Sequence, residues 1–302
     1  MKPHWNGVFP AVTTQLNPDQ SIDLAATSRH LEVLIASGVS GLVMCGSLGE
    51  NQTLTPDEKR AVIKCAVETA RGRIPVLSGV AESSTSAAID YLRHMKLLGA
   101  DGVMLLPPMS YKGDPRETIA YFRAVAAGSD LPIMIYNNPI SYANDITPLM
   151  FKELADEKKF AAIKESSGDP RRITELHNAV GDRYALFTGV DDLLLEASIL
   201  GIDGWVAGTG IAFPEENQHL WNLTREKRWD EARQLYRWFQ PLLKLDTHVH
   251  FVQYIKLCLQ EMGLGKEWVR APRLPIVGDE RERVLKIIRD AIRERPAILK
   301  KH

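Results

Sequence analysis

Eight short apolar runs recur along the chain, and their spacing constrains the fold more than any other feature of the sequence. They occupy residues 7–13, 41–45, 74–80, 102–106, 131–136, 160–164, 184–188 and 204–207. A short run that is apolar on both faces is typical of a buried parallel strand. The runs lie about 20 to 35 residues apart, which is the spacing of a repeated strand–helix unit.

The segments between these runs are amphipathic and carry helix start signals. Thr55, Asp114, Thr147 and Asp169 each precede a proline, which combines a capping residue with proline at the first helical position. Alternating strands and helices form a parallel sheet covered by helices. Eight such units favour an α/β fold of the closed (β/α)8 TIM barrel type over an open doubly wound sheet, and no glycine-rich phosphate-binding sequence follows the first run.

The last part of the chain does not continue this pattern. Apolar residues there recur at helical spacing and indicate about three further helices. No low-complexity linker precedes them. We therefore expect a barrel over residues 1–220 and a C-terminal helical appendage over residues 221–302 that packs on it.

Composition excludes several classes of protein. With Lys+Arg 37 against Asp+Glu 38, the net charge of -1 offers no basic surface for nucleic acid. No apolar run is long enough to cross a membrane, and the first ten residues lack the apolar core of a signal peptide. Three scattered cysteines predict neither disulfides nor a zinc site, and reduced thiols fit a cytoplasmic protein.

Neither a metal nor a cofactor is expected. His248 and His250 lie two positions apart in a presumed helix, where they would not share a face. We interpret them as surface or interface histidines.

One lysine directly follows an apolar run at the end of a predicted strand. In a barrel of this kind the working residues lie at the C-terminal ends of the strands, so Lys164 would project into the mouth. Loss of hydration lowers the pKa of a lysine, and a neutral amine attacks a carbonyl to form a Schiff base. The structural alternative is a lysine that reaches solvent or pairs with a carboxylate.

Two other strand ends carry hydroxyl groups. Tyr136 closes the preceding strand, close enough for its hydroxyl to carry a proton for a substrate bound at Lys164, although it could equally be an aromatic core residue. Ser47 lies in the sequence GSLGE, where backbone N–H groups and the hydroxyl could hold a carboxylate. The same sequence could be only a tight turn.

Four motifs, taken in order, resemble one known superfamily. GSLGE at 46–50, YNNP at 136–139, IKES at 163–166 and TGVDD at 188–192 are similar to the dihydrodipicolinate synthase / N-acetylneuraminate lyase superfamily. The resemblance runs over about residues 5–275. It implies a (β/α)8 barrel with C-terminal helices, lysine Schiff-base (class I) lyase chemistry and a homotetramer built as a dimer of dimers.

The resemblance also implies roles for individual residues. Lys164 aligns with the Schiff-base lysine, and Tyr136 with the tyrosine that relays protons. Ser47 and the Leu48 backbone align with the pocket for the carboxylate of a 2-oxo acid. The backbone of two further residues is expected to line the site: Gly189 and Val206.

Two departures from the family pattern bear on the substrate. Dihydrodipicolinate synthases have an arginine two residues past the motif proline, where this chain has Ser141, and neither arginine nor lysine occurs between Asn137 and Phe151. A distal carboxylate would lose its charge-assisted partner. The second relay tyrosine of those synthases aligns with Ser110, with Tyr111 one residue on, so either residue could take part in binding or proton transfer.

The sequence around residues 106–111, 136–139 and 204–208 resembles a catabolic branch that includes 1-pyrroline-4-hydroxy-2-carboxylate deaminases. The resemblance implies a small 4-hydroxylated 2-oxo acid or its cyclic imine as substrate, with 2,5-dioxopentanoate as product. The alternatives are a 2-keto-3-deoxy sugar acid dehydratase or aldolase, and dihydrodipicolinate synthase itself. A non-enzymatic alternative is a sensor of 2-oxo acids.

Overall fold

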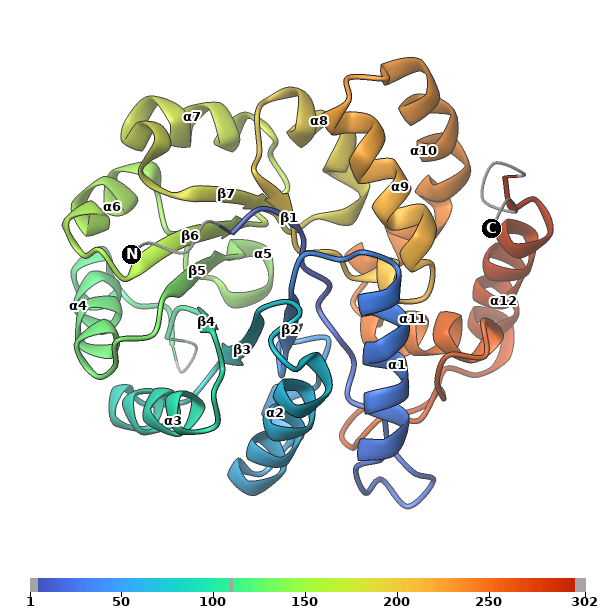
Figure 1. Cartoon of the computed structure of the whole chain (residues 1–302), viewed down its shortest axis with the longest axis horizontal. Helices are drawn as coiled ribbons and strands as arrows, with labels where there is room; N and C mark the ends of the chain where they lie inside the picture. The colour runs from blue at the N-terminus through green and yellow to red at the C-terminus, as the bar shows by residue number, and fades with distance from the viewer. Residues whose placement is uncertain (1–4, 109–110, 297–302) are drawn as a thin grey trace.

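The computed structural model describes residues 5–108 and 111–296, and within them eight parallel strands form one sheet (Figure 1). Each strand lies in or overlaps one of the eight apolar runs, so the predicted strand positions are confirmed. The strands are β1 (Gly7–Val8), β2 (Leu42–Met44), β3 (Val76–Val80), β4 (Gly102–Leu105), β5 (Ile133–Asn137), β6 (Phe160–Glu165), β7 (Ala185–Thr188) and β8 (Gly204–Trp205).

The sheet closes on itself as a barrel. Its hydrogen-bonded order is β1-β8-β7-β6-β5-β4-β3-β2. The continuation of β1 then pairs with β2, because Val12 donates from its N–H to the Val43 carbonyl at 2.9 Å and Val43 donates to the Pro10 carbonyl at 2.9 Å. The predicted (β/α)8 fold class is therefore confirmed, and the carboxyl ends of all the strands meet at one mouth.

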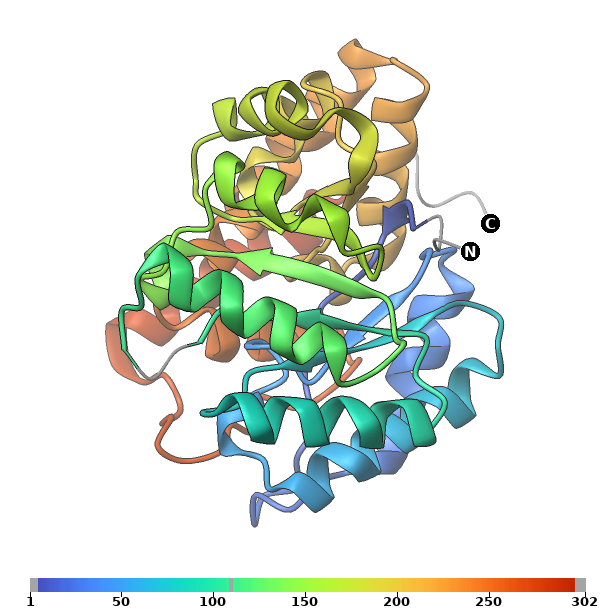
Figure 2. The ribbon, with the colours of Figure 1, turned by 90° about the vertical axis from the view of Figure 1, so that its left-hand side faces the viewer.

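Helices cover the outside of the strands. In Figure 2, α3 (teal) and α4 (green) lie across the front of the sheet. The barrel helices are α1 (Leu24–Ala36), α2 (Pro56–Ala70), α3 (Thr85–Leu97), α4 (Pro115–Ala127), α5 (Pro139–Tyr142), α6 (Pro148–Glu153), α7 (Arg171–Val180), α8 (Leu194–Ile199) and α9 (Pro214–Arg225). Short 3-10 turns complete the connections: η1 (Asn51–Thr53), η2 (Leu154–Asp156), η3 (Gly181–Arg183), η4 (Asp191–Leu193) and η5 (Thr209–Ile211).

The predicted helix starts hold at three of the four cap–proline sequences. Thr55 and Asp114 form capping boxes with Glu58 and Glu117, and Thr147 accepts from the Met150 N–H. At Asp169 the start differs by one residue: Pro170 is the N-cap residue of α7, while Asp169 Oδ1 still accepts from the Arg171 N–H at 3.0 Å and pairs with the Arg171 guanidinium.

Up to residue 296, where the described chain ends, three helices follow the barrel helices: α10 (Trp229–Leu243), α11 (Phe251–Glu261) and α12 (Gly278–Arg293), with the turn η6 (Lys244–Thr247) between the first two. In Figure 1, α10 and α12 lie together at one side of the molecule. The predicted helical appendage is therefore present. The division of the chain at residue 220 stays a prediction, and that residue lies within α9.

Aromatic side chains fill the interior of the barrel below its mouth. Phe9 and Phe187 are fully buried and meet edge to face, with ring centroids 5.3 Å apart. Glycines make room for them: a Cβ at Gly41 would lie 2.3 Å from the Phe9 ring, and one at Gly204 would lie 2.1 Å from the Phe187 ring. The barrel is thus a packed core with its site at one end.

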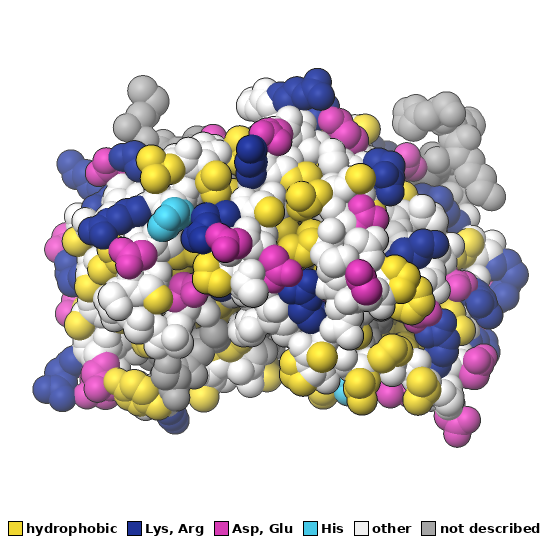
Figure 3. All heavy atoms as spheres, turned by 90° about the horizontal axis from the view of Figure 1, so that it is seen from below, with side chains coloured by type: hydrophobic (Ala, Val, Ile, Leu, Met, Phe, Trp, Pro, Cys, Tyr) yellow, Lys and Arg dark blue, Asp and Glu magenta, His cyan; other side chains and the backbone are white. Residues whose placement is uncertain are grey.

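The surface carries mixed charges. On the face in Figure 3, basic and acidic side chains alternate and do not gather by sign. Among the helices of the described ranges, none combines the length and the apolar character that crossing a bilayer requires.

Candidate active site

Lys164 lies at the mouth of the barrel, on β6. The register of the sheet pairs it with Tyr136 on β5 and with Phe187 on β7, so these three side chains stand side by side on the inner face. The Lys164 side chain is buried, with the residue 6% exposed, and its Nζ lies 4.0 Å from the centroid of the Tyr136 ring. The register therefore confirms the prediction that Tyr136 and Lys164 lie next to each other on adjacent strands.

The ammonium group of Lys164 has no partner of opposite charge in contact with it. Within residues 5–108 and 111–296, no carboxylate comes within 4.0 Å of its Nζ. Burial lowers the pKa of Lys164 to about 8, and the charges of Asp246 and Asp191 oppose that shift. At pH 7 roughly a tenth of the amine is then neutral, against less than about a thousandth for an ordinary lysine. In the described chain, Lys164 therefore neither reaches solvent nor pairs directly with a carboxylate, which were the two structural alternatives.

Glycine at position 189 leaves room for the lysine side chain. A Cβ on Gly189 would lie 2.3 Å from the Lys164 Cε and 2.3 Å from the Ser166 hydroxyl. Val206 is buried nearby, and its N–H donates to the Thr188 carbonyl at 2.9 Å, within the sheet. Gly189 thus lies at the end of β7 against Lys164, and Val206 lies at the end of β8, on the far side of β7.

Tyr136 is held in place by the residues that follow it. Asn138 donates from its Nδ2 to the Tyr136 hydroxyl at 3.0 Å. Burial raises the pKa of Tyr136 to about 12, and the hydrogen bond from Asn138 opposes this rise. The phenol therefore stays protonated at neutral pH, and its hydroxyl relays a proton only as a donor and acceptor within a chain of groups.

The structure adds a second tyrosine that sequence reasoning missed. Ser47 and Tyr142 are hydrogen-bonded through their hydroxyls, and the Tyr142 ring lies edge-on to that of Tyr136 with centroids 5.8 Å apart. Tyr142 ends the short helix α5, which Asn138 caps and Pro139 starts. In the sequence, Asn138 followed by Pro139 is the same signal of a capping residue before proline that starts α2, α4 and α6. This signal could have predicted α5.

The GSLGE sequence forms a tight turn after β2. Glu50 and Asn51 donate from their N–H groups to the carbonyls of Ser47 and Gly46. In the described part of the chain, no backbone acceptor faces the N–H of Leu48, which leaves that N–H available to a ligand beside the Ser47 hydroxyl. The interpretation of GSLGE as a tight turn is therefore compatible with its interpretation as a site for a carboxylate.

An ion pair anchors this turn to the C-terminal helices. Glu50 accepts from Lys256 Nζ on α11 at 2.5 Å and from the Arg270 N–H at 3.0 Å. Arg273 adds a charge 3.7 Å from the same carboxylate. The positive charge of Arg273 also acts on Tyr142, whose pKa it lowers against the dominant effect of burial. An arginine thus approaches the mouth from the C-terminal segment.

Of the two residues predicted at the place of the second relay tyrosine, the structure describes Tyr111. Ser110 lies outside the described residues. Tyr111 is 59% exposed, and a hydrogen bond with Glu117 at the start of α4 raises its pKa. In residues 5–108 and 111–296, Tyr111 forms no hydrogen bond or ring contact with Lys164, Tyr136 or Ser47.

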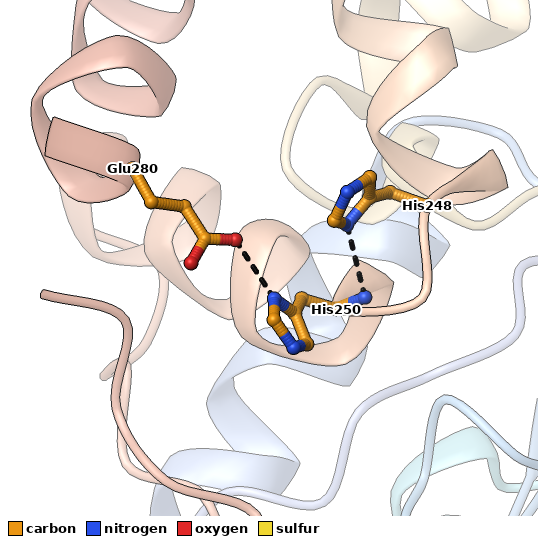
Figure 4. Close-up of side chains that lie close together, drawn as sticks. All are labelled: His248, His250 and Glu280. Atoms are coloured by element: carbon orange, nitrogen blue, oxygen red, sulfur yellow. Dashed lines mark hydrogen bonds and ion pairs between the residues drawn. The ribbon is translucent and has the colours of Figure 1, made fainter.

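Two histidines just before α11 lie beside a glutamate at the start of α12 (Figure 4). Ligand atoms of His248, His250 and Glu280 lie within 4.8 Å of one another, and imidazole with carboxylate is a donor set that zinc accepts. Glu280 already accepts from His250 Nδ1 at 2.7 Å and from the Tyr254 hydroxyl at 2.5 Å, which ties α11 to α12. The expectation that the two histidines lie in one helix is wrong, because α11 begins only after His250. The absence of a metal stays a prediction.

The fold and the residues at its mouth define a (β/α)8-barrel lyase. The chain belongs to the dihydrodipicolinate synthetase family, whose family model matches residues 4–291. The resemblance expected from the four motifs is therefore confirmed.

Similar proteins cover nearly the whole chain. A 4-hydroxy-tetrahydrodipicolinate synthase of Macrococcus caseolyticus is 31% identical over 95% of this chain and 96% of its own length. The 4-hydroxy-tetrahydrodipicolinate synthase structure from Methylacidiphilum fumariolicum SolV matches with a TM-score of 0.92 at 28% identity, over 98% of both chains. The dihydrodipicolinate synthase of Acinetobacter baumannii, solved in complex with pyruvate, matches with a TM-score of 0.91 at 27% identity, over 96% of this chain and 99% of that chain.

Proposed function

We propose that this chain is a Schiff-base-forming lyase in which Lys164 is the covalent nucleophile. Its substrate is a small 4-hydroxylated 2-oxo acid or the cyclic imine of one. The observation that carries the proposal is the buried amine of Lys164, which has no ion-pair partner in the described chain and a pKa lowered to about 8. Such an amine is neutral often enough to attack a ketone.

Substrate binding is assigned to groups around this amine. The carboxylate of the 2-oxo acid accepts hydrogen bonds from the Ser47 hydroxyl and the Leu48 N–H, and the backbone at Gly189 and Val206 lines the opposite side. The Lys164 nitrogen then bonds to C2, whose oxygen leaves as water. The hydroxyls of Tyr136, Tyr142 and Ser47 form a route for the protons of this step.

The preference for a hydroxylated substrate tail rests on the segment after β5. Ser141 is exposed on α5 where synthases have an arginine, and no cation occurs between Asn137 and Phe151. A second carboxylate would find no charged partner from this segment, whereas a hydroxyl needs none. For the cyclic imine, addition of one water and loss of ammonia would give 2,5-dioxopentanoate.

The main alternative is the synthase reaction. The names of the relatives favour it, and Arg273 supplies a cation near Tyr142 from another direction. Dehydration or aldol cleavage of a 2-keto-3-deoxy acid would use the same imine and differ only in the bond that breaks. A 2-oxo acid sensor would bind through the same pocket without turnover.

Borohydride trapping tests the covalent step. Reduction in the presence of pyruvate should add the mass of the reduced adduct to the peptide that contains Lys164, and Lys164→Ala should show none. A folded wild-type protein that gains no adduct would refute the proposal. A panel assay then separates the reactions: ammonia with 2,5-dioxopentanoate indicates the deaminase, pyruvate the aldolase, and water loss alone the dehydratase.

Assembly and location are proposed with the function. We propose a homotetramer, for which the family membership is the support, and light scattering coupled to size-exclusion chromatography measures its mass. We propose a cytoplasmic location, supported by the free thiols of Cys45, Cys65 and Cys258. Fractionation of the source cells would check it.

A further inference from the structure

Asp246 brings a carboxylate from the C-terminal helices to the mouth of the barrel. It lies in η6, which packs against η4 after β7. Its carboxyl group rests on the backbone of Gly208, just past β8: a Cβ at position 208 would lie 2.2 Å from Asp246 Oδ1 and 2.6 Å from its Cγ. Only glycine at 208 leaves space for this carboxyl group.

The neighbouring Asp191 shows what a structural carboxylate looks like here. Asp191 is buried and accepts hydrogen bonds from Trp205 Nε1 at 3.0 Å, the Gly208 N–H at 3.0 Å and the Thr209 N–H at 2.7 Å. These bonds fix the loop on which the carboxyl group of Asp246 rests. The Asp191 carboxylate is therefore occupied by hydrogen bonds that hold the fold together.

Asp246 differs because nothing in the described chain satisfies it. It is partly buried, yet no donor in residues 5–108 and 111–296 forms a hydrogen bond or ion pair with its carboxylate. Partial burial removes some of the hydration of this carboxylate and supplies no donor in its place, so its ionised form is destabilised. The charge of Asp246 acts on both residues of the covalent step, since it raises the pKa of Lys164 and that of Tyr136.

We propose, building on the proposed function, that Asp246 is a catalytic acid–base residue that transfers the proton at C3 of the substrate bound to Lys164. The Asp246 carboxylate takes the proton from C3. The C–H electron pair becomes the C2–C3 double bond, and the electrons of the iminium double bond move to nitrogen, which gives a neutral enamine.

The same group then completes the elimination. The protonated Asp246 donates its proton to the C4 hydroxyl, which leaves as water. The enamine electrons form the C3–C4 double bond and restore the iminium, so one proton is taken and one is returned. Burial and the nearby charge of Asp191 raise the pKa of Asp246 well above its usual range, which suits a group that both takes and gives a proton near neutral pH.

The test uses two partial reactions of the full-length enzyme with pyruvate. Borohydride trapping at Lys164 reports imine formation, and loss of the pyruvate methyl signal in deuterated water, followed by proton NMR, reports proton transfer at C3. Asp246→Asn should slow the exchange by roughly 10²-fold or more while trapping at pH 7 is not slowed. Trapping persists because removal of the negative charge lowers the pKa of Lys164 and increases its neutral fraction.

Two further variants separate this role from structural damage. Gly208→Ala displaces the carboxyl group without removing it, and it should also slow exchange while leaving trapping in place. Asp230→Asn removes an exposed carboxylate from the first turn of α10, and it should exchange like the wild type.

The outcomes distinguish the two proposals. Absence of trapping in the wild type refutes the proposed function and this inference with it. Trapping in the wild type without exchange, or equal exchange rates in wild type and Asp246→Asn, overturns the role of Asp246 alone and leaves the covalent lysine intact.

Discussion

Lys164 and Lys256 are both buried lysines, yet their surroundings give them opposite roles. Lys256 is fully buried on α11, and its ammonium is matched by the Glu50 carboxylate at 2.5 Å and the Trp268 carbonyl at 2.6 Å. Lys164 faces an aromatic ring and has no carboxylate in contact with it within the described residues. Burial alone therefore does not make a lysine reactive. The absence of a direct counter-charge leaves the ammonium destabilised and the amine available.

Replacing the reactive lysine should have the largest effect on activity. Lys164→Ala is expected to remove the pyruvate adduct and to reduce turnover by about 10⁴-fold or more, because the nucleophile is lost. Mass spectrometry of the trapped peptide and steady-state rates measure this. Lys159→Ala, which removes a lysine just before β6, is the matched control and should keep both. An adduct that persists in Lys164→Ala would assign the covalent step to another lysine.

The paired lysine should instead affect folding. Lys256→Met removes the direct counter-charge of the buried Glu50 carboxylate and leaves Arg273 at 3.7 Å, which is expected to cost about 3 kcal/mol of unfolding free energy. Urea denaturation measures this loss. The double variant Glu50→Gln/Lys256→Met should recover much of it, because no uncompensated charge remains. A single variant as stable as the wild type would show that the pair contributes little to the fold.

The lowered pKa of Lys164 should also make the stability of the protein depend on pH. The folded-state pKa of Lys164 is about 8, below its unfolded value of 10.5, so below pH 8 folding carries the cost of a buried ammonium. Lys164→Met should therefore unfold with a free energy on the order of 2 kcal/mol higher than the wild type at pH 7. The wild type gains stability as the pH rises from about 8 towards 10.5, so the difference should shrink there. Thermal or urea unfolding across this range measures it, and a constant difference would contradict the lowered pKa.

The smallest effect is expected at Tyr142. Tyr142→Phe keeps the ring against Tyr136 and removes only the hydroxyl that bonds Ser47. Turnover should fall by roughly 10-fold, while trapping at Lys164 changes little. Tyr184→Phe is the matched control because it removes a buried hydroxyl that donates to the Phe151 carbonyl, just before β7 and at the opposite end of that strand from Gly189. Equal rates for the two variants would remove Tyr142 from the proton route.

Local pattern was sufficient to predict the barrel and its central pair of residues. An apolar run followed by a capped amphipathic segment is a signal confined to a few neighbouring residues, so all eight strands could be placed. Parallel strands that end at one mouth bring Tyr136 and Lys164 together by register alone. For Tyr136 and Lys164, the positions of the two strands in the sequence were therefore enough to predict that the side chains are neighbours.

The remaining parts of the site depend on packing between distant segments. Asp246 and Lys256 reach the mouth only because α10 and α11 fold back on the barrel, and no periodicity encodes that contact. Tyr142 lies in a helix too short to produce a periodic pattern. His248 and His250 were expected to lie in one helix, but the chain turns between η6 and α11 and brings their rings to 5.4 Å.

The aromatic rings beneath the site restrict how substrate can enter the barrel and how product can leave it. Phe9 and Phe187 fill the interior beneath the site, each packed against a glycine that admits no larger residue. In the described part of the chain these rings block the interior beneath the site, so we expect reactant to enter and product to leave by the mouth alone. Bound product should therefore compete with incoming reactant. A larger residue in place of either glycine should lower the stability of the barrel without creating a second exit.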